Sequence, residues 1–284
     1  MASGRNWWGD FEIDVGQTLR WQIGPTSFWI TRGANDWRVA SKPGADPFAD
    51  HLTIAEPVSQ APDEEVETRR FALRSQHGVV RLLPALADRP VVVKTEKPLY
   101  IPASEEATLF IGSPLWLQVH VGAKFTRVLD APIFRPSDTW FGPDTLSGEL
   151  CYASQTQARL TVENLPRLPH RAVSAVHIKN KGNSNLFMEK MKVPVGHLSL
   201  FVSETAHLWT DGLMLDRAGD SDAATVQIGY RSSLTGALTR VSAAREKVSK
   251  GFLLDAFGSL LNRKAEKEDE RIPRKPGASS DTDT

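Results

Sequence analysis

Apolar and polar residues alternate one by one in short runs along most of this chain, and proline or glycine separates the runs. In the opening stretch WWGDFEIDVGQTLRWQIGPTSFWITRGANDWRV (7–39), Leu19, Trp21 and Ile23 alternate with polar neighbours. The pair Gly24-Pro25 marks a turn between two such runs. A period of two places successive side chains on opposite faces, which is the geometry of a β-strand. The sequence therefore predicts a β-meander at the start of the chain.

Five of the eight tryptophans lie among the first 37 residues. Trp21 and Trp37 interleave with aliphatic residues, as core tryptophans do. Trp7 and Trp8 precede the first strand, and Trp29 lies opposite the aliphatic face of its strand. We favour packing in the core or between domains for these rings, because large aromatic side chains are usually buried. A ligand-binding platform is the alternative.

The rest of the chain up to residue 235 continues the strand pattern. Strands are expected at 91–95, 99–101, 107–111 and 115–121, with prolines between them. Residues 173–178, an Asn/Gly-rich turn and residues 186–191 resemble a pair of strands in an immunoglobulin-like module. The length of 284 residues favours two domains. We therefore predict an all-β protein with two immunoglobulin-like β-sandwich domains, at 1–122 and 123–235.

The pattern changes at about residue 236. Apolar residues then recur at intervals of three and four, which predicts an amphipathic helix over 236–264. The tail at 265–284 is polar and is expected to be disordered. The helix either packs on the chain's own sheets or, with its basic residues, contacts a membrane surface or a protein partner. The residues expected at such a contact are Lys247, Lys250, Phe252, Leu253, Phe257, Leu260 and Leu261.

Charge and cysteine content narrow the function classes. The 34 basic and 34 acidic residues give a formal net charge of zero, which disfavours a nucleic-acid binder. The single cysteine, Cys151, excludes an intramolecular disulfide and any multi-cysteine metal site. The first residues lack the apolar core of a signal peptide, and no stretch has the roughly 18 apolar residues of a membrane-spanning helix. We expect a cytoplasmic protein, peripheral to a membrane if its helix binds one.

The usual catalytic motifs are absent from the sequence, including GxSxG, GxxxxGK[ST], GxGxxG and HExxH. Cys151 lies in a strand-like segment, and a lone cysteine there is more often a small buried residue than a nucleophile. Asp138, Asp144 and Glu149 flank the pair Trp140-Phe141, but such acidic residues usually belong to turns. We expect no enzymatic activity, cofactor or metal, and take Trp140 and Phe141 as candidate ligand contacts.

Three stretches carry a resemblance to a known family: WWGDFEIDVGQTLRWQIGPTSFWITR, KPLYIPASEEATLFIGSPLWLQV and PHRAVSAVHIKNKGNSNLFMEKMKVPVGHLSLF with the later LWTDGLMLDR. Together they resemble the prokaryotic family catalogued as domain of unknown function 432, over about residues 7–235. The resemblance implies no activity and no catalytic residue.

Three hypotheses of function follow from the sequence. The first is a non-enzymatic accessory protein that binds another protein, at the inner face of a membrane through its C-terminal helix. The second is a β-sandwich that binds a glycan or small ligand with Trp140, Phe141 and Trp29. The third is an enzyme that uses Cys151 or the set Asp138, Asp144 and Glu149.

Overall fold

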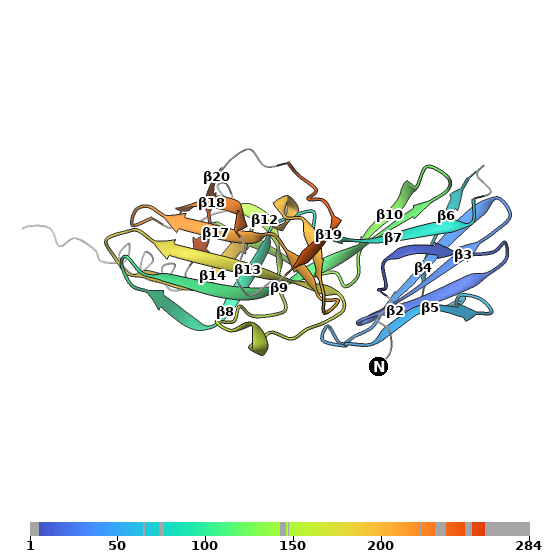
Figure 1. Cartoon of the computed structure of the whole chain (residues 1–284). Helices are drawn as coiled ribbons and strands as arrows, with labels where there is room; N and C mark the ends of the chain where they lie inside the picture. Colours follow the sequence, from blue (N-terminus) through green and yellow to red (C-terminus); the bar gives the residue numbers. More distant parts are fainter. Residues whose placement is uncertain are drawn as a thin grey trace, which may run out of the picture.

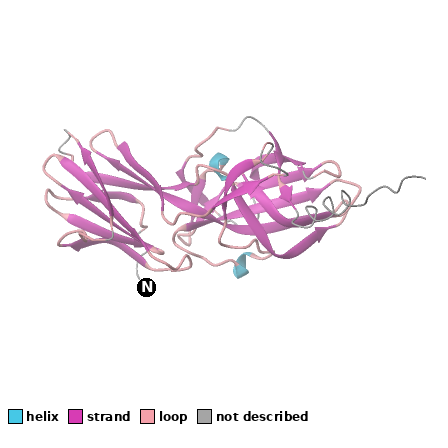
Figure 2. Cartoon of the chain, turned by 180° about the vertical axis from the view of Figure 1, so that it is seen from behind, coloured by secondary structure: helices cyan, strands magenta, loops and turns pink. Residues whose placement is uncertain are grey.

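The computed structural model describes residues 6–64, 66–73, 77–142, 146, 148–221, 223–230, 237–247 and 252–258. The prediction of an all-β protein is confirmed for these residues (Figure 2). The described helices are two short 3-10 turns, η1 (Val162–Asn164) and η2 (Val195–His197). Figure 1 shows an elongated molecule with β2–β6 at one end and β13, β14, β17 and β18 at the other.

The β-meander predicted for the start of the chain forms a five-stranded antiparallel sheet. Its strands, in spatial order, are β5 (Leu52–Val58), β2 (Thr18–Ile23), β3 (Thr26–Arg32), β4 (Asp36–Pro43) and β6 (Glu67–Ala72). Gly24 and Pro25 form the two-residue turn between β2 and β3, with a positive φ of 58° at Gly24. That backbone conformation suits glycine at the first position of a hairpin turn.

The largest sheet has eleven strands and curls along the molecule. Its members are β1 (Gly9–Glu12), β7 (Val79–Leu86), β9 (Glu106–Val121), β10 (Thr126–Pro132), β13 (Arg171–Asn180), β15 (Leu200–Ser203), β16 (Leu208–Thr210), β17 (Gly212–Arg217), β18 (Ala223–Tyr230), β19 (Leu238–Ser242) and β20 (Phe252–Asp255). The 16-residue strand β9 runs through its middle (Figure 1). Residues 106–114 of β9 pair with β13, whereas residues 115–121 pair with β7.

A third sheet of five strands covers one face of this curled sheet. It contains β11 (Asp138–Phe141), β12 (Glu149–Ala153), β8 (Val91–Ile101), β14 (Leu186–Val193) and β21 (Phe257–Gly258). One continuous apolar core includes Trp21 and Phe28 of the first sheet, Leu117 of β9, and Met188 of β14. The predicted core positions of Trp21 and Trp37 are confirmed, since 0% and 2% of these side chains are exposed.

Two prolines expected between strands lie inside strands. Pro98 lies in β8 where the pairing with β14 shifts register, and Pro114 lies where β9 changes partner from β13 to β7. A proline lacks the N–H that a ladder requires, so it is tolerated where the ladder is interrupted. The strands predicted as separate pairs are therefore single long strands, β8 and β9.

The structure departs from the immunoglobulin-like pattern expected for residues 123–235. β13 and β14 do not pair with each other, because β13 pairs with β9 and β14 pairs with β8. β13 also pairs in parallel with β16 and β17, and β12 pairs in parallel with β8. Immunoglobulin sandwiches are built from antiparallel pairs. The Asn/Gly-rich segment after β13 therefore carries the chain from one sheet to another instead of closing a hairpin.

The helix predicted over 236–264 is wrong for the residues that the structure describes there. Residues 238–242, 252–255 and 257–258 are the strands β19, β20 and β21. Phe257 is 2% exposed, packs in the core and pairs with Met191 of β14. The described apolar residues of this segment recur at intervals of three and four because they belong to short strands that follow one another closely, and not to one helix. Lys250, Leu260, Leu261 and the tail lie outside the described residues.

Candidate functional site

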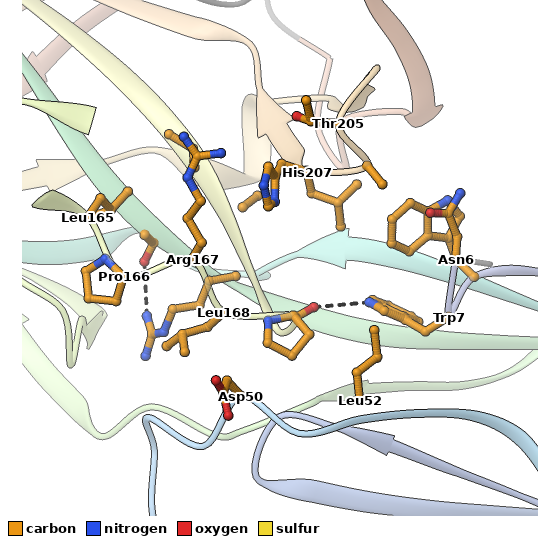
Figure 3. Close-up of a pocket in the computed structure, with 18 residues that line it drawn as sticks. Asn6, Trp7, Asp50, Leu52, Leu165, Pro166, Arg167, Leu168, Thr205 and His207 are labelled. Carbon is orange, nitrogen blue, oxygen red and sulfur yellow. Dashed lines mark hydrogen bonds between the residues drawn. The ribbon is translucent and has the colours of Figure 1, made fainter. Parts of the chain in front are cut away.

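A cavity of about 320 Å³ opens where the N-terminal segment meets the large sheet (Figure 3). Its walls come from five parts of the chain: the segment before β1, the loop before β5 with the start of β5, the middle of β9, the segment leading into β13 with the start of β13, and the turn between β15 and β16. The lining residues are Asn6, Trp7, Trp8, Asp50, Leu52, Gly112, Leu165, Pro166, Arg167, Leu168, Pro169, Arg171, Ala172, Val173, Thr205, Ala206, His207 and Leu208.

One wall of the cavity is aromatic. Trp7 is buried and Trp8 is half-buried, and their rings meet edge to face with centroids 5.4 Å apart. The Nε1–H of Trp7 donates a hydrogen bond to the carbonyl oxygen of Pro169 at 3.1 Å, which fixes the N-terminal segment against the residues before β13 (Figure 3). The partly exposed ring of Trp8 thus provides a fixed apolar surface for a ligand.

Arg171, the first residue of β13, is a buried cation in this cavity. It is 6% exposed, and its two terminal nitrogens donate to the carbonyl oxygen of Gly112 at 3.0 Å and to Oε1 of Gln155 at 2.7 Å. Both acceptors are neutral. Its Nε is buried and has no hydrogen-bond partner among the described residues. Burial lowers the pKa of Arg171 to about 10, because the low-dielectric surroundings disfavour the charged form.

The remaining polar side chains of the cavity are less buried than Arg171. Arg167 is exposed and lies close to His207, as Figure 3 shows. Burial lowers the pKa of His207, and the neighbouring charge of Arg167 lowers it further. Asp50 is the one acidic residue of the lining. The cavity therefore combines an apolar body with an excess of positive charge, which suits an organic ligand that carries a negative charge.

A second, larger cavity of about 630 Å³ is lined by β3, β4 and β6 of the first sheet and by β9 and β10 of the large sheet. Trp116 and Tyr152 meet there with ring centroids 5.4 Å apart, and the Tyr152 hydroxyl donates to Asp88 at 3.1 Å. Its arginines have acidic partners, since Arg69 pairs with Glu67 and Arg135 with Asp138. We prefer the first cavity as a ligand site, because its buried cation, Arg171, has no acidic partner among the described residues.

The predicted ligand contacts Trp140 and Phe141 form no aromatic platform. Trp140 is 39% exposed, but Phe141 is buried against Val92 and Cys151. Lys190 and Lys192 lie about 5.4 and 5.5 Å from the centre of the Phe141 ring. One exposed ring offers much less stacking surface than the two or three that a glycan site uses.

The acidic residues around this pair do not converge. Asp138 pairs with Arg135 at 3.1 Å, and Glu149 pairs with Lys192 at 2.8 Å. Asp138 lies opposite Tyr152 and Phe141 lies opposite Glu149 in the β11–β12 pair, so the two carboxylates stand at opposite ends of it. Asp144 lies outside the described residues.

Cys151 is fully buried between these strands. Burial and, to a smaller extent, the nearby carboxylate of Glu149 raise the pKa of its thiol to about 11. Both effects suppress the thiolate that a nucleophilic cysteine needs. The interpretation of Cys151 as a small buried residue fits this environment.

Within the described ranges, no group of three His, Cys, Asp or Glu side chains could hold a metal ion. The same part of the chain contains no helix of the length and apolarity that would cross a bilayer.

Sequence reasoning considered Trp7 and Trp8 but missed the basic residues of the site. Arg167 and Arg171 flank the short run LPH in the segment RLPHR. Two arginines separated by a proline-containing turn could have drawn attention to this segment. Nothing in the sequence indicated that Arg171 would be buried without an acidic partner.

Comparison with known proteins identifies a family. The model of the family described as "Protein of unknown function (DUF432)" matches residues 7–262, and the chain belongs to this family. The resemblance predicted over 7–235 is thus confirmed, and the match extends further to include β19, β20 and β21. No curated protein and no solved structure matches the chain.

Proposed function

We propose that this member of the DUF432 family is a non-enzymatic binding protein whose ligand site is the cavity beside Trp8 and Arg171. The observation that carries the proposal is a cavity of about 320 Å³ whose lining is largely apolar and includes a few polar groups. This size and composition are typical of small-molecule sites. Of the three hypotheses drawn from the sequence, the cavity favours the small-ligand one, with the site moved from Trp140 to Trp8.

In this proposal the two ends of the molecule act as two β-sandwich domains. The cavity then lies at their junction, because Trp8 and Leu52 belong to the N-terminal end while Arg171 and Leu208 belong to the other. Domain junctions are frequent ligand sites, since walls from two bodies enclose a ligand more fully than one surface does.

The neutral fluorophore N-phenyl-1-naphthylamine tests whether the cavity accepts an apolar ligand. We expect its fluorescence to rise on binding, and Trp8→Ala to weaken the affinity by at least about fivefold through loss of the aromatic wall. Trp8→Phe should retain most of the affinity, because it keeps a ring at the same position.

Trp140→Ala is the matched control in this titration. Trp140 lies on β11 and not among the lining residues, so its removal should leave the affinity unchanged. The opposite result, with binding lost in Trp140→Ala and kept in Trp8→Ala, would move the ligand to the pair Trp140-Phe141.

The other proposal is that the protein binds a partner at a membrane surface. Removal of the C-terminal segment tests it. Lys247 is exposed, while Arg245 is committed to Asp130 by two hydrogen bonds of 2.7 Å. Liposome flotation should compare the full chain with a chain ending at Gly258, which keeps β19, β20 and β21. Recovery with anionic liposomes is expected to fall on truncation, and equal recovery of both chains would contradict membrane binding through residues 259–284.

A further inference from the structure

We infer that the ligand of this cavity carries an anionic group that pairs with Arg171, while its apolar body lies against Trp8. The inference rests on the proposed function, because it names the ligand class of the same site. The ligand is thus an organic anion, with a carboxylate or a phosphate group on an apolar or aromatic body.

The first argument is the cost of burying an unpaired charge. Arg171 is 6% exposed, and no carboxylate of the described residues lies within 4 Å of its guanidinium nitrogens. A buried charge normally has an oppositely charged partner, because removing it from water costs several kcal/mol. An anionic ligand would supply that partner.

The second argument is the number of donors left over. A guanidinium has five N–H groups, and Arg171 uses its two terminal nitrogens on the oxygens of Gly112 and Gln155. Each terminal nitrogen therefore keeps a second N–H for a ligand, while the Nε–H is fully buried and has no acceptor among the described residues. A carboxylate or phosphate oxygen accepts such hydrogen bonds strongly, since the interaction is charge-assisted.

Arg217, the second arginine that is buried among the described residues, has an acidic neighbour. Arg217 is 4% exposed, donates to the carbonyl oxygen of Ser221 and to Asn180, and lies 3.9 Å from a carboxylate oxygen of Asp220. Arg217 is therefore a structural residue that closes the loop after β13. Arg171 has the same burial without the acidic partner.

The charge of the lining favours an anion over a cation. Two arginines, Arg167 and Arg171, face one acidic residue, Asp50, and the difference is one positive charge with His207 neutral. Asp50 is exposed, so it does not neutralise the buried guanidinium. A low-dielectric wall strengthens the attraction between Arg171 and a bound anion.

Two fluorophores of matched shape test the inference. The probe 8-anilinonaphthalene-1-sulfonate has the body of N-phenyl-1-naphthylamine with one added sulfonate. We expect the wild-type protein to bind the sulfonate at least about tenfold more tightly than the neutral probe. Arg171→Gln should abolish this preference and leave the affinity for the neutral probe within about twofold. Arg167→Gln, at an exposed position of the lining, is the matched control and should retain most of the preference.

Arg171→Lys keeps the charge and protects the test against a folding defect in Arg171→Gln. It should retain part of the preference, since lysine carries the charge without the fork of the guanidinium. Displacement of the bound sulfonate by benzoate or by phenyl phosphate then shows which anionic group the site prefers.

The outcomes separate the two proposals. If neither fluorophore binds the wild-type protein, the cavity is no ligand site and the proposed function fails. Equal binding of both fluorophores by the wild type overturns the anionic ligand but keeps the cavity as a site. A preference that persists in Arg171→Gln overturns the role of Arg171.

Discussion

Trp21→Ala is expected to lower the free energy of unfolding by about 3–5 kcal/mol, the usual range for deleting a buried aromatic side chain. Trp21 lies in the middle of β2, is 0% exposed, and meets the ring of Phe11 edge to face with centroids 5.2 Å apart. The loss combines the apolar surface that is no longer buried with the cavity left in a close-packed core.

Urea unfolding followed by far-ultraviolet circular dichroism measures this loss, because the remaining tryptophans complicate a fluorescence signal. Trp140→Ala is the control: it deletes the same side chain where 39% is exposed, and we expect a change under about 1 kcal/mol. Equal losses for the two variants would mean that Trp21 is not part of the core. The indole nitrogen of Trp21 has no hydrogen-bond partner among the described residues, so the loss comes from packing.

The strands around Trp21 could be predicted because their signal is local. In β2 the buried residues Leu19, Trp21 and Ile23 alternate with half-buried neighbours, which is the pattern of a sheet with one face in the core. The turn at Gly24-Pro25 could be read from residue types alone. Residue propensity, periodicity and turn residues all indicate a β-hairpin there, and a prediction is reliable when these signals agree.

The C-terminal segment could not be predicted from the same kind of signal. Leu238–Ser242 and Phe252–Asp255 are short strands held by partners far away in the sequence, β15 and β18. Their apolar residues fit a helical spacing when read in one continuous window. A short strand at a sheet edge owes its structure to its partner, and that contact is invisible in a periodicity argument.

The candidate site was hidden for a related reason. Its walls bring together Trp8, Asp50, Arg171 and His207, which are separated by long stretches of chain. None of these residues belongs to a compact motif. The sequence could indicate that Trp8 was a poor fit to a strand core, but only the fold brings it into the lining of the same cavity as the buried Arg171.

His170→Gln is expected to remove much of the acid sensitivity of this protein between pH 7 and pH 4.5. His170 is 1% exposed, and burial together with the adjacent charge of Arg171 lowers its pKa from 6.5 to about 4. The unfolded chain therefore binds a proton at a higher pH than the folded protein does. The stability that neutral His170 allows is therefore fully present well above pH 6.5. It falls as the pH drops from 6.5 towards 4, and the fall levels off below pH 4.

The expected loss in the wild-type protein is about 2–3 kcal/mol between pH 7 and pH 4.5, from roughly 1.4 kcal/mol for each pH unit of the pKa difference. The surroundings of the His170 ring explain why its protonation is unfavourable in the folded protein. Its Nε2 lies 3.1 Å from the carbonyl oxygen of Pro47, and its Nδ1 is buried without a partner among the described residues. A β-carbon added at Gly24 would lie 2.2 Å from Nδ1, so the turn closes tightly over the ring.

Urea unfolding of the wild type and His170→Gln at several pH values between 8 and 4.5 measures the effect. At pH 8 the imidazole is neutral in both states, so the difference between the two proteins there reports packing alone. The difference in free energy of unfolding should shrink on acidification. In the wild type, folding keeps His170 neutral at a pH where the unfolded chain would protonate it, whereas His170→Gln has no such group. Half-buried His207, whose pKa burial also lowers, is present in both proteins and cancels in the comparison. Parallel stability curves for the two proteins would show that His170 is not the group that limits folding in acid.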